Sequence, residues 1–196
     1  MTTPGESSDG NTPLSPEELA DLIPNLATKQ DLNEWERENI LLAREWAIRD
    51  RTSAPEMASD EYVRKLHRKM FSETRKWAGR YRTTEKNIGV LFPEIRERLM
   101  TLFGDVRYWL EHRAYSTDEI AVRFHHRLVM IHPFPNGNGR HARLLADAFV
   151  MKHGLATLTW GARNLIKPGD ARVRYLEALR AADDGDIELL IAFARM

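Results

Sequence analysis

The sequence predicts an all-α fold of about seven helices, with one small β-hairpin between residues 80 and 90. Apolar residues recur at helical spacing through most of the chain after Ser15, and Ser or Asp start signals precede several of these segments. The segment 80–90 is polar and lacks the helical period. The segment 139–153 is apolar on much of its circumference, so it is expected to be the central, buried helix.

Two helices are expected in the first part of the chain. The first covers about 31–50, and Asn39 interrupts its apolar stripe. The stripe consists of Leu32, Trp35, Leu42 and Trp46. Ser59 is a typical N-cap for the second helix, which is expected to continue to about Trp77 and to stop at Gly79.

Five helices are expected after residue 90, one of which is the central helix. The strongest apolar period in the chain predicts a helix over about 92–112, and Ser116 with Glu119 forms a capping-box pattern that opens the next helix. Pro133 disfavours helical backbone at His132, which is therefore expected at a helix-to-loop junction. The last two helices are expected at about 170–182 and 186–195.

Composition excludes several classes of site and partner. The 196-residue chain has 29 Lys and Arg against 29 Asp and Glu, so no global field attracts it to nucleic acid or to anionic lipid. The absence of Cys excludes disulfides and thiolate metal sites. No apolar run approaches the roughly 20 residues that span a bilayer. We expect a cytoplasmic protein with neither a nucleic-acid nor a membrane partner.

One globular domain is expected after a short leader. Residues 1–13 have nothing to bury and are predicted to be disordered. Residues 14–55 are expected to form an N-terminal helical region, and residues 56–196 the main domain.

The segment from His132 to Arg143 carries the candidate chemistry. Gly137 and Gly139 permit backbone angles that side chains forbid, so consecutive amides can point at an anion, and the start of the next helix adds partial positive charge. Arg140 and Arg143 share one face of that helix, where both can engage the same oxyanion chain. His132 has an unperturbed pKa of about 6.5 and is a candidate proton acceptor.

This segment resembles the signature of the Fic/Doc (Fido) family, His-x-Phe-x-Asp/Glu-Gly-Asn-Gly-Arg-x-x-Arg. The resemblance extends to Trp77-Ala-Gly-Arg-Tyr-Arg and to Asn87-Ile. Within the family, the chain resembles the group called mobile mystery protein B, through Arg82-Thr-Thr-Glu-Lys-Asn-Ile-Gly and through the segment from His132 to Arg143. The resemblance implies the Fic/Doc fold, with 56–196 as the Fic domain and the hairpin as a flap.

The resemblance also implies a role for each position of the signature. His132 would be the general base, Phe134 a structural anchor, and Asn136 would stand where the family holds Mg²⁺. The phosphate-binding residues would be Gly137, Asn138, Gly139, Arg140 and Arg143. The flap that docks the target protein would consist of Thr83, Thr84, Glu85, Lys86, Asn87 and Ile88.

The implied function is transfer of AMP from ATP, with Mg²⁺, to a Ser, Thr or Tyr hydroxyl of a target protein. A second interpretation is transfer of UMP, phosphocholine or phosphate. Phosphorylating members tend to have Lys where this chain has Gly139, which disfavours that reaction. A third interpretation is a catalytically weak nucleotide-binding regulatory module with an antitoxin-like partner.

Two features depart from the family pattern. Asn136 is a neutral amide at the acidic metal position, although hard cations favour charged oxygen. Many members carry an inhibitory helix with Ser/Thr-x-x-x-Glu-Gly/Asn, and Glu38-Asn39 is similar, although Glu34 occupies the Ser/Thr place. We hypothesise that Glu38 pairs with Arg143 and limits triphosphate binding. The alternative is a Glu on the edge of an amphipathic helix.

The remaining candidates are given structural interpretations. His125 and His126 lack a metal-ligand pattern and are assigned to packing or hydrogen bonding. Trp160 is interpreted as a core residue, with the border of an adenine pocket as the alternative. The Arg and Lys residues of 64–82 are interpreted as a solvated face rather than a nucleic-acid-binding stripe.

Overall fold

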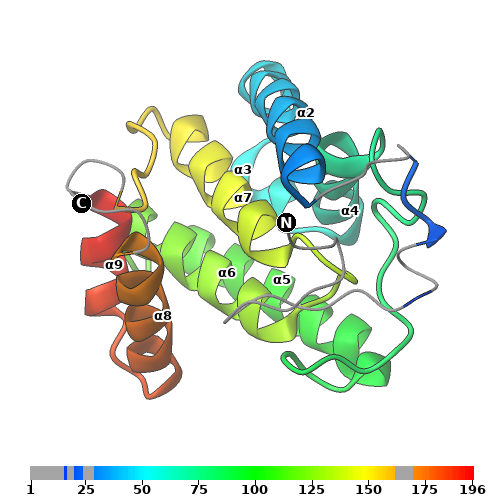
Figure 1. The fold of residues 1–196 in the computed structure, drawn as a ribbon. Coiled ribbons are helices and arrows are strands. Elements are labelled where there is room, and N and C mark those ends of the chain that lie inside the picture. The colour runs from blue at the N-terminus through cyan, green and yellow to red at the C-terminus, as the bar shows by residue number, and fades with distance from the viewer. Residues whose placement is uncertain (1–15, 17–19, 24–28, 162–169) are drawn as a thin grey trace.

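The regular structure of the described residues is helical (Figure 1). The computed structural model describes residues 16, 20–23, 29–161 and 170–196, so the expected disordered leader, 1–13, lies outside the described part. Eight α-helices and one 3-10 turn are bounded within it. They are α2 (Lys29–Arg49), α3 (Ala54–Met57), α4 (Asp60–Phe71), η1 (Phe92–Glu94), α5 (Ile95–Glu111), α6 (Thr117–Ile131), α7 (Asn138–Lys152), α8 (Asp170–Asp183) and α9 (Glu188–Arg195).

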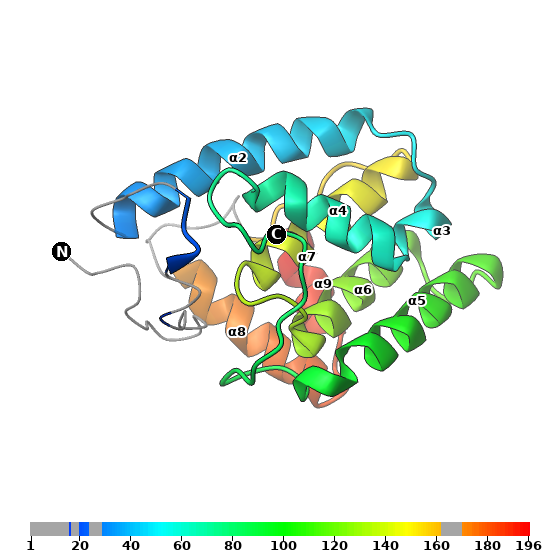
Figure 2. The same ribbon diagram turned by 90° about the vertical axis from the view of Figure 1, so that its right-hand side faces the viewer.

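Helices α6 and α7 form the centre of the fold. They pack along each other, α2 and α4 pack on α7, and α5 and α9 pack on α6. Figure 2 shows α2 lying across the top of the molecule and α5 along the opposite side. Leu145, Ala148 and Phe149 of α7 are completely buried. The prediction of a central buried helix is therefore confirmed. Separately, no helix in the described part is long and apolar enough to cross a membrane.

The predicted period and start signal are observed in α5 and α6. Ile95 and Leu102 are buried on one face of α5. Ser116 is the N-cap of α6, and its hydroxyl accepts a hydrogen bond from the Glu119 amide at 3.2 Å. The carboxylate of Glu119 pairs with Arg123 at 2.7 Å instead of reaching back to the N-cap. The sequence therefore predicted the start of α6 correctly, with one side-chain bond of the capping box formed.

The second predicted helix ends earlier than expected. Helix α4 stops at Phe71, whereas its pattern predicted an end near Trp77. The Phe71 carbonyl accepts from the Thr74 amide at 3.0 Å and from the Thr74 hydroxyl at 3.1 Å, so the chain tightens into a turn where the helix ends. Trp77 is buried all the same, in the irregular segment that follows.

The buried face of α2 is not the predicted apolar stripe. Trp35 and Leu42 are 48% and 58% exposed, and Trp46 is partly buried. The side chain of Leu32 lies outside the described residues. The buried side chains of α2 are Glu36, Asn39, Ala43 and Ala47. The two alanines allow α4 and α7 to pack closely, and ion pairs satisfy the buried carboxylate of Glu36.

The expected β-hairpin at 80–90 does not form, and the prediction was wrong. The segment is an irregular loop. The guanidinium of Arg82 donates to the carbonyls of Thr84, at 3.0 Å, and of Val90. A side chain therefore binds carbonyls that backbone amides would bind in a hairpin, and the loop closes around Arg82 without a ladder of strand bonds.

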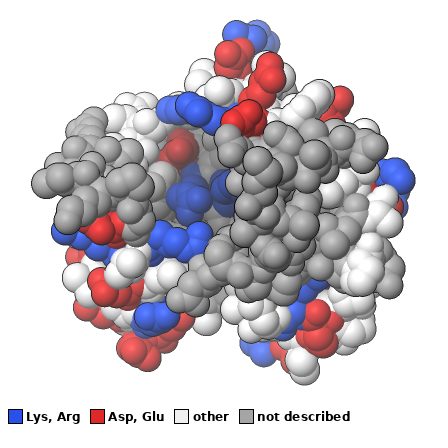
Figure 3. Space-filling view, viewed as in Figure 1, with Lys and Arg blue, Asp and Glu red and all other residues white. Residues whose placement is uncertain are grey.

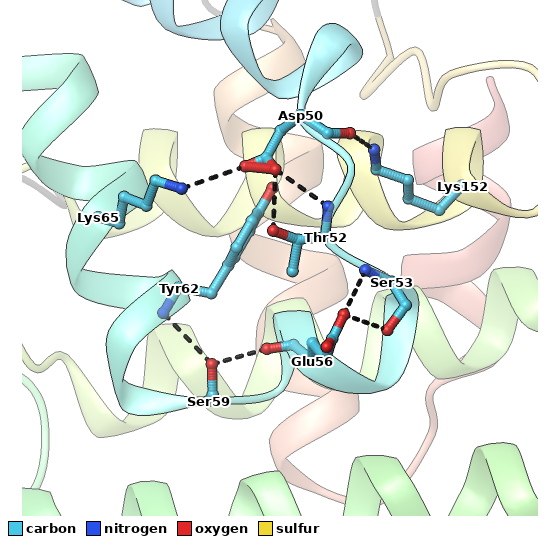
Figure 4. A network of polar contacts seen from close by, with 8 residues as sticks. All are labelled: Asp50, Thr52, Ser53, Glu56, Ser59, Tyr62, Lys65 and Lys152. Atoms are coloured by element: carbon cyan, nitrogen blue, oxygen red, sulfur yellow. Dashed lines mark hydrogen bonds and ion pairs between the residues drawn. The ribbon is translucent and has the colours of Figure 1, made fainter.

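A polar network fixes the carboxyl end of α2 (Figure 4). Asp50 follows α2 and accepts from the amide and hydroxyl of Thr52 at 3.0 and 2.8 Å. Its carboxylate also pairs with Lys65 of α4 at 3.5 Å, and Lys152 of α7 donates to its backbone carbonyl. The ends of α2 and α7 are thereby held together, and the first half of α2 lies beside the start of α7.

Candidate functional site

The segment with the candidate chemistry joins α6 to α7. His132 closes α6 in the left-handed conformation (φ 53°, ψ 58°), and its amide donates to the Leu128 carbonyl at 3.1 Å. Pro133 opposes further helix, as the sequence predicted. Because residues 133–137 are a short connection, His132 and the first turn of α7 lie at the same end of the two helices.

The imidazole of His132 is held by its own helix. Its Nδ1 lies 3.2 Å from the carbonyl oxygen of Val129. A carbonyl can only accept, so Nδ1 carries the proton of the neutral ring and Nε2 carries the lone pair. Burial lowers the pKa of His132 to about 4, since the residue is 6% exposed. At pH 7 the ring is therefore neutral and in the form that accepts a proton.

The loop expected to be the docking flap lies against His132. Arg82 donates from Nε to the His132 carbonyl at 2.7 Å, and its amide donates to the Pro133 carbonyl at 2.9 Å. A Cβ added to Gly89 would lie 2.5 Å from the Cβ of His132, so the loop needs glycine at this approach. The flap candidates Thr83, Thr84, Glu85, Asn87 and Ile88 are exposed, and Lys86 is partly buried.

A buried histidine outside the signature supports the loop. Phe134 is completely buried and stacks on His67, with ring centroids 3.8 Å apart. His67 donates from Nε2 to the Asn136 carbonyl at 3.1 Å and accepts at Nδ1 from the Gly79 amide at 3.0 Å. Burial lowers the pKa of His67 well below its ordinary value, which keeps the ring neutral and able to make both bonds.

Gly137 shapes the entry into α7. Its φ is +81°, and an added Cβ would lie 2.7 Å from the ring of Phe71, so no other residue fits without displacement. In the described part of the chain, no protein group accepts from the first-turn amides of Asn138, Gly139 and Arg140. Together with the positive end of the helix dipole, these amides form a candidate anion site.

The side chain of Asn138 braces the loop. Its Oδ1 accepts from the Phe134 amide at 2.9 Å, and its Nδ2 donates to the Phe134 carbonyl at 2.8 Å. The side chain is buried, and both ends of its amide are used inside the loop. A contact of Asn138 with an anion would therefore come from its backbone amide.

Gly139 leaves space beside two polar side chains. Among the described residues, an added Cβ would meet only Arg143 Nη1, at 3.8 Å, and the Tyr175 hydroxyl, at 3.9 Å. The Arg143 guanidinium lies 5.1 Å from the ring centroid of Tyr175. The Tyr175 hydroxyl is 3.0 Å from Nε2 of the buried His125. Helix α8 thus contributes a tyrosine that sits beside the second signature arginine.

Glu36, rather than Glu38, reaches a signature arginine. Its carboxylate is 1% exposed and pairs with Arg140 and with Arg75, whose Nε lies 2.7 Å away. Glu38 is exposed and makes no ion pair within the described residues. The structure gives this pair in place of the hypothesised pair between Glu38 and Arg143.

Near its centre, over α7, the face in Figure 3 is hollowed, and Lys and Arg side chains gather there.

The described residues do not fit a Mg²⁺ site held by the protein alone. Asn136 is partly exposed and offers one neutral amide oxygen. Across 29–161 and 170–196, no three His, Asp or Glu side chains come together as a metal-binding group. The carboxylate of Glu36 is engaged by two guanidiniums. Because Mg²⁺ favours carboxylate and phosphate oxygens, the protein supplies too few ligands by itself.

Trp160, His125 and His126, which the sequence assigned to packing or hydrogen bonding, lie near the site. Trp160 packs against the core, and its Nε1 donates to Asp147 at 2.9 Å. Burial raises the pKa of Asp147 to about 6. The ring of Trp160 lies 4.5 Å from that of His125, while His126 pairs with Asp183 at 2.8 Å. Trp160 thus packs on the core and contacts His125, which in turn contacts Tyr175.

Comparison with known proteins decides the family. Residues 58–150 match the family model described as Fic/DOC family. The chain contains a Fic/DOC family domain. The Fic domain resembles protein adenylyltransferase fic-1 of Caenorhabditis elegans, at 34% identity over 119 residues, which are 59% of this chain and 22% of that protein. Protein adenylyltransferase Fic of Nematostella vectensis is 37% identical over 119 residues, covering 59% and 26%. The match spans about a quarter of these relatives' length.

The Fic fold is also seen in solved structures. BepC from Bartonella tribocorum, determined with bound AMPPNP, superimposes with a TM-score of 0.68 at 18% identity, covering 92% of this chain and 97% of that chain. The fold around the signature is therefore that of Fic proteins. Assignment to the mobile mystery protein B group stays a prediction.

Three residues beside the Fic signature were not predicted as site residues: Glu36, His67 and Tyr175. The sequence contained a signal for Glu36, because Glu36, Asn39, Ala43 and Ala47 also recur at helical spacing and so define an alternative buried face. The other two lie far from the signature in sequence, and no local pattern points to them.

Proposed function

We propose that the Fic domain transfers AMP from ATP to a hydroxyl group of another protein. The observation that carries this proposal is the neutral imidazole of His132 in the connection that leads to the anion site at the start of α7, with Arg82 of the neighbouring loop bound to its backbone carbonyl. Two relatives are named protein adenylyltransferases, and BepC binds AMPPNP, which supports a nucleotide as the donor.

His132 would act as the general base. Its Nε2 takes the proton of the target hydroxyl while the hydroxyl oxygen attacks the α-phosphorus of ATP. The bond from the α-phosphorus to the bridging oxygen breaks, and pyrophosphate leaves. The proton on His132 then passes to solvent. A pKa of about 4 keeps the imidazole in its accepting form at neutral pH, at the expense of basicity.

The start of α7 would hold the phosphates. The amides of 138–140 point out of the first turn, and Gly139 leaves room beside Arg143 for an oxyanion. Arg140 would join them after its pair with Glu36 opens. Charge neutralisation and positioning are the main demands of this type of transfer, so a base, a helix start and two guanidiniums are sufficient protein groups.

The loop 83–88 would dock the target. It is exposed and is closed by Arg82, which also binds the His132 carbonyl. A peptide lying along this loop would bring its side chain toward His132. Because no strand pairing is present, docking here would rest on side chains as well as on backbone groups.

The test uses ATP labelled either at the α- or at the γ-phosphate, incubated with a lysate and the full chain. Retention of the α-label on protein, with the γ-label lost, is the expected result for AMP transfer, whereas retention of the γ-label indicates phosphorylation. His132→Ala should reduce α-labelling by about 100-fold or more. His112→Ala, a change at an exposed histidine, is the matched control. Labelling that persists in His132→Ala would contradict the proposal.

A further inference from the structure

A second concave site lies beside α4, away from the signature. It has a volume of about 290 Å³, and five cations line it together with Ser72 and Ala78. None of the described residues that line it is a carboxylate. The cations are Arg64, Arg68, Arg75, Lys76 and Arg80. They belong to the basic run 64–82, which the sequence suggested was a solvated face, and the fold gathers them around one hollow.

The pocket is built by a helix and a loop that returns to it. Arg64, Arg68 and Ser72 lie four residues apart on one face of α4 and its end. Arg64 donates from Nε to the Gly79 carbonyl at 2.9 Å. A Cβ on Gly79 would lie 2.8 Å from the Arg64 carbonyl, so the loop rests directly on the helix. The guanidiniums are therefore held on a preformed surface.

An extended segment fastens the other side of the same loop. The Ile23 amide donates to the Thr74 carbonyl at 3.0 Å, and the Lys76 amide donates to the Asp21 carbonyl at 3.1 Å. These two bonds flank a bridge between Leu22 and Arg75. The loop that carries the basic side chains is thus held by a side-chain bond from α4 on one side and by backbone bonds on the other.

Charge pairing leaves two of the five cations without a counterion. Arg75 pairs with Glu36, while Arg64 and Lys76 have carboxylate neighbours at 3.5 and 3.8 Å, in exposed pairs that contribute little. Arg68 and Arg80 make no ion pair with any residue that the structure describes. Like charges around one concavity repel each other, and an anion in the hollow removes that repulsion.

We propose that this pocket binds a small molecule that carries a phosphate monoester. A phosphate dianion balances the charges of Arg68 and Arg80, and guanidinium forks match its oxygens. The Ser72 hydroxyl adds a donor. The volume is near the lower end of small-ligand pockets, about 300 Å³, so it exceeds the needs of a phosphate group and leaves room for the group esterified to it.

The pocket is separate from the candidate nucleotide site. It uses no residue of 132–143, although Arg75 contacts Glu36, which in turn contacts Arg140. A nucleic-acid surface is a weaker interpretation, because the cations surround one hollow and the net charge of the chain is zero.

The test measures binding of glycerol 3-phosphate and of ATP to the full chain by equilibrium dialysis. Arg68→Gln/Arg80→Gln should weaken glycerol 3-phosphate binding by about tenfold or more and leave ATP binding unchanged. Arg140→Gln/Arg143→Gln should do the reverse. Arg49→Gln/Arg98→Gln removes the same charge from exposed helix positions and should change neither.

The outcomes separate this proposal from the proposed function. If ATP binds neither the wild type nor any variant, while glycerol 3-phosphate binding depends on Arg68 and Arg80, the pocket is supported and the proposed function is not. Equal glycerol 3-phosphate affinity in the wild type and in Arg68→Gln/Arg80→Gln overturns the pocket, whatever ATP does. Binding that depends on these arginines for a duplex oligonucleotide but not for glycerol 3-phosphate also overturns it. Unfolding midpoints of all variants check that each one is folded.

Discussion

The carboxylate of Glu36 and the guanidinium of Arg140 form an ion pair that joins α2 to the first turn of α7, across 104 positions of sequence. Two cations at a helix start oppose the helix dipole, and a carboxylate there offsets this. The same carboxylate would compete with the phosphates of a nucleotide for Arg140. The pair therefore both stabilises the ligand-free domain and restrains the proposed reaction.

Glu36→Gln is expected to raise the affinity for ATP by about tenfold, because Arg140 then gains a phosphate partner without first losing a carboxylate. Calorimetric titration with ATP measures the effect. Glu38→Gln, a change at an exposed glutamate on the same helix, is the control and should leave affinity unchanged. The Gln variant at 36 should also lower the free energy of unfolding by about 3 kcal/mol, since it leaves two arginines near a buried neutral group. Equal ATP affinity in both variants would show that Glu36 does not compete with ATP for Arg140.

The two signature glycines should respond to alanine in opposite ways. Gly137→Ala places a Cβ against the ring of Phe71 at positive φ and should lower the free energy of unfolding by about 1–3 kcal/mol. Gly139→Ala meets no described protein atom closer than 3.8 Å and favours helix, so stability should be kept or raised by up to about 1 kcal/mol. The methyl would occupy the space beside Arg143, and ATP binding should weaken. Urea unfolding measures the stability of each variant, and titration with ATP measures its affinity. If Gly139→Ala binds ATP as tightly as the wild type, the phosphates do not lie beside Gly139.

Asn136→Asp should allow the proposed reaction to reach its half-maximal rate at a lower concentration of Mg²⁺. The substitution supplies a charged oxygen to a site that has only a neutral amide. We expect half-maximal labelling at about tenfold lower Mg²⁺ than in the wild type, measured by titrating the metal at fixed ATP. Thr101→Asp, an equal charge change at an exposed position of α5 away from the site, serves as the control. Identical Mg²⁺ titrations of the wild type and of Asn136→Asp would show that this side chain does not reach the metal.

Acid should destabilise the domain between about pH 6.5 and pH 4. Burial lowers the pKa of His141 to about 4, whereas an unfolded histidine titrates near 6.5. The unfolded state then binds more protons in this window, so the free energy of unfolding falls as pH falls. His141 alone should account for about 2 kcal/mol between pH 7 and pH 5.

Urea unfolding at pH 7 and pH 5 measures that loss. His141→Gln should have a smaller difference between the two pH values, whereas His112→Gln, at the surface, should retain the full difference. His132 and His67 have lowered pKa values for the same reason, so some acid sensitivity should remain in every variant. Stability that rises toward pH 5 would contradict the burial of these rings.

Local sequence rules predicted the elements whose structure is decided locally. Pro133 and Gly137 impose the exit from α6 and the entry into α7, and Ser116 fixes the start of α6 by a bond to its own first turn. The period of α5 identified its buried face. Each of these depends on atoms within a few residues, and sequence spacing describes such relationships well.

Contacts between distant segments could not be predicted in the same way. The apolar residues of α2 suggested the wrong face, because Glu36 is the side chain that is buried there, in ion pairs with two arginines distant in sequence, and Trp35 is exposed. The hairpin does not form because the Arg82 side chain donates to carbonyls that backbone amides would bind in a hairpin. Both outcomes depend on partners that are close only after folding.

The double hydrogen bond of His67 has a consequence for how the glycine-rich connection moves. Opening residues 132–137 would break the bond to Asn136 and separate the stacked ring of Phe134 from α4. Such an opening disrupts the core as well as a surface loop. Amide hydrogens in this connection should therefore exchange with solvent deuterium as slowly as those of α6 and α7, although the segment has no helix or strand of its own.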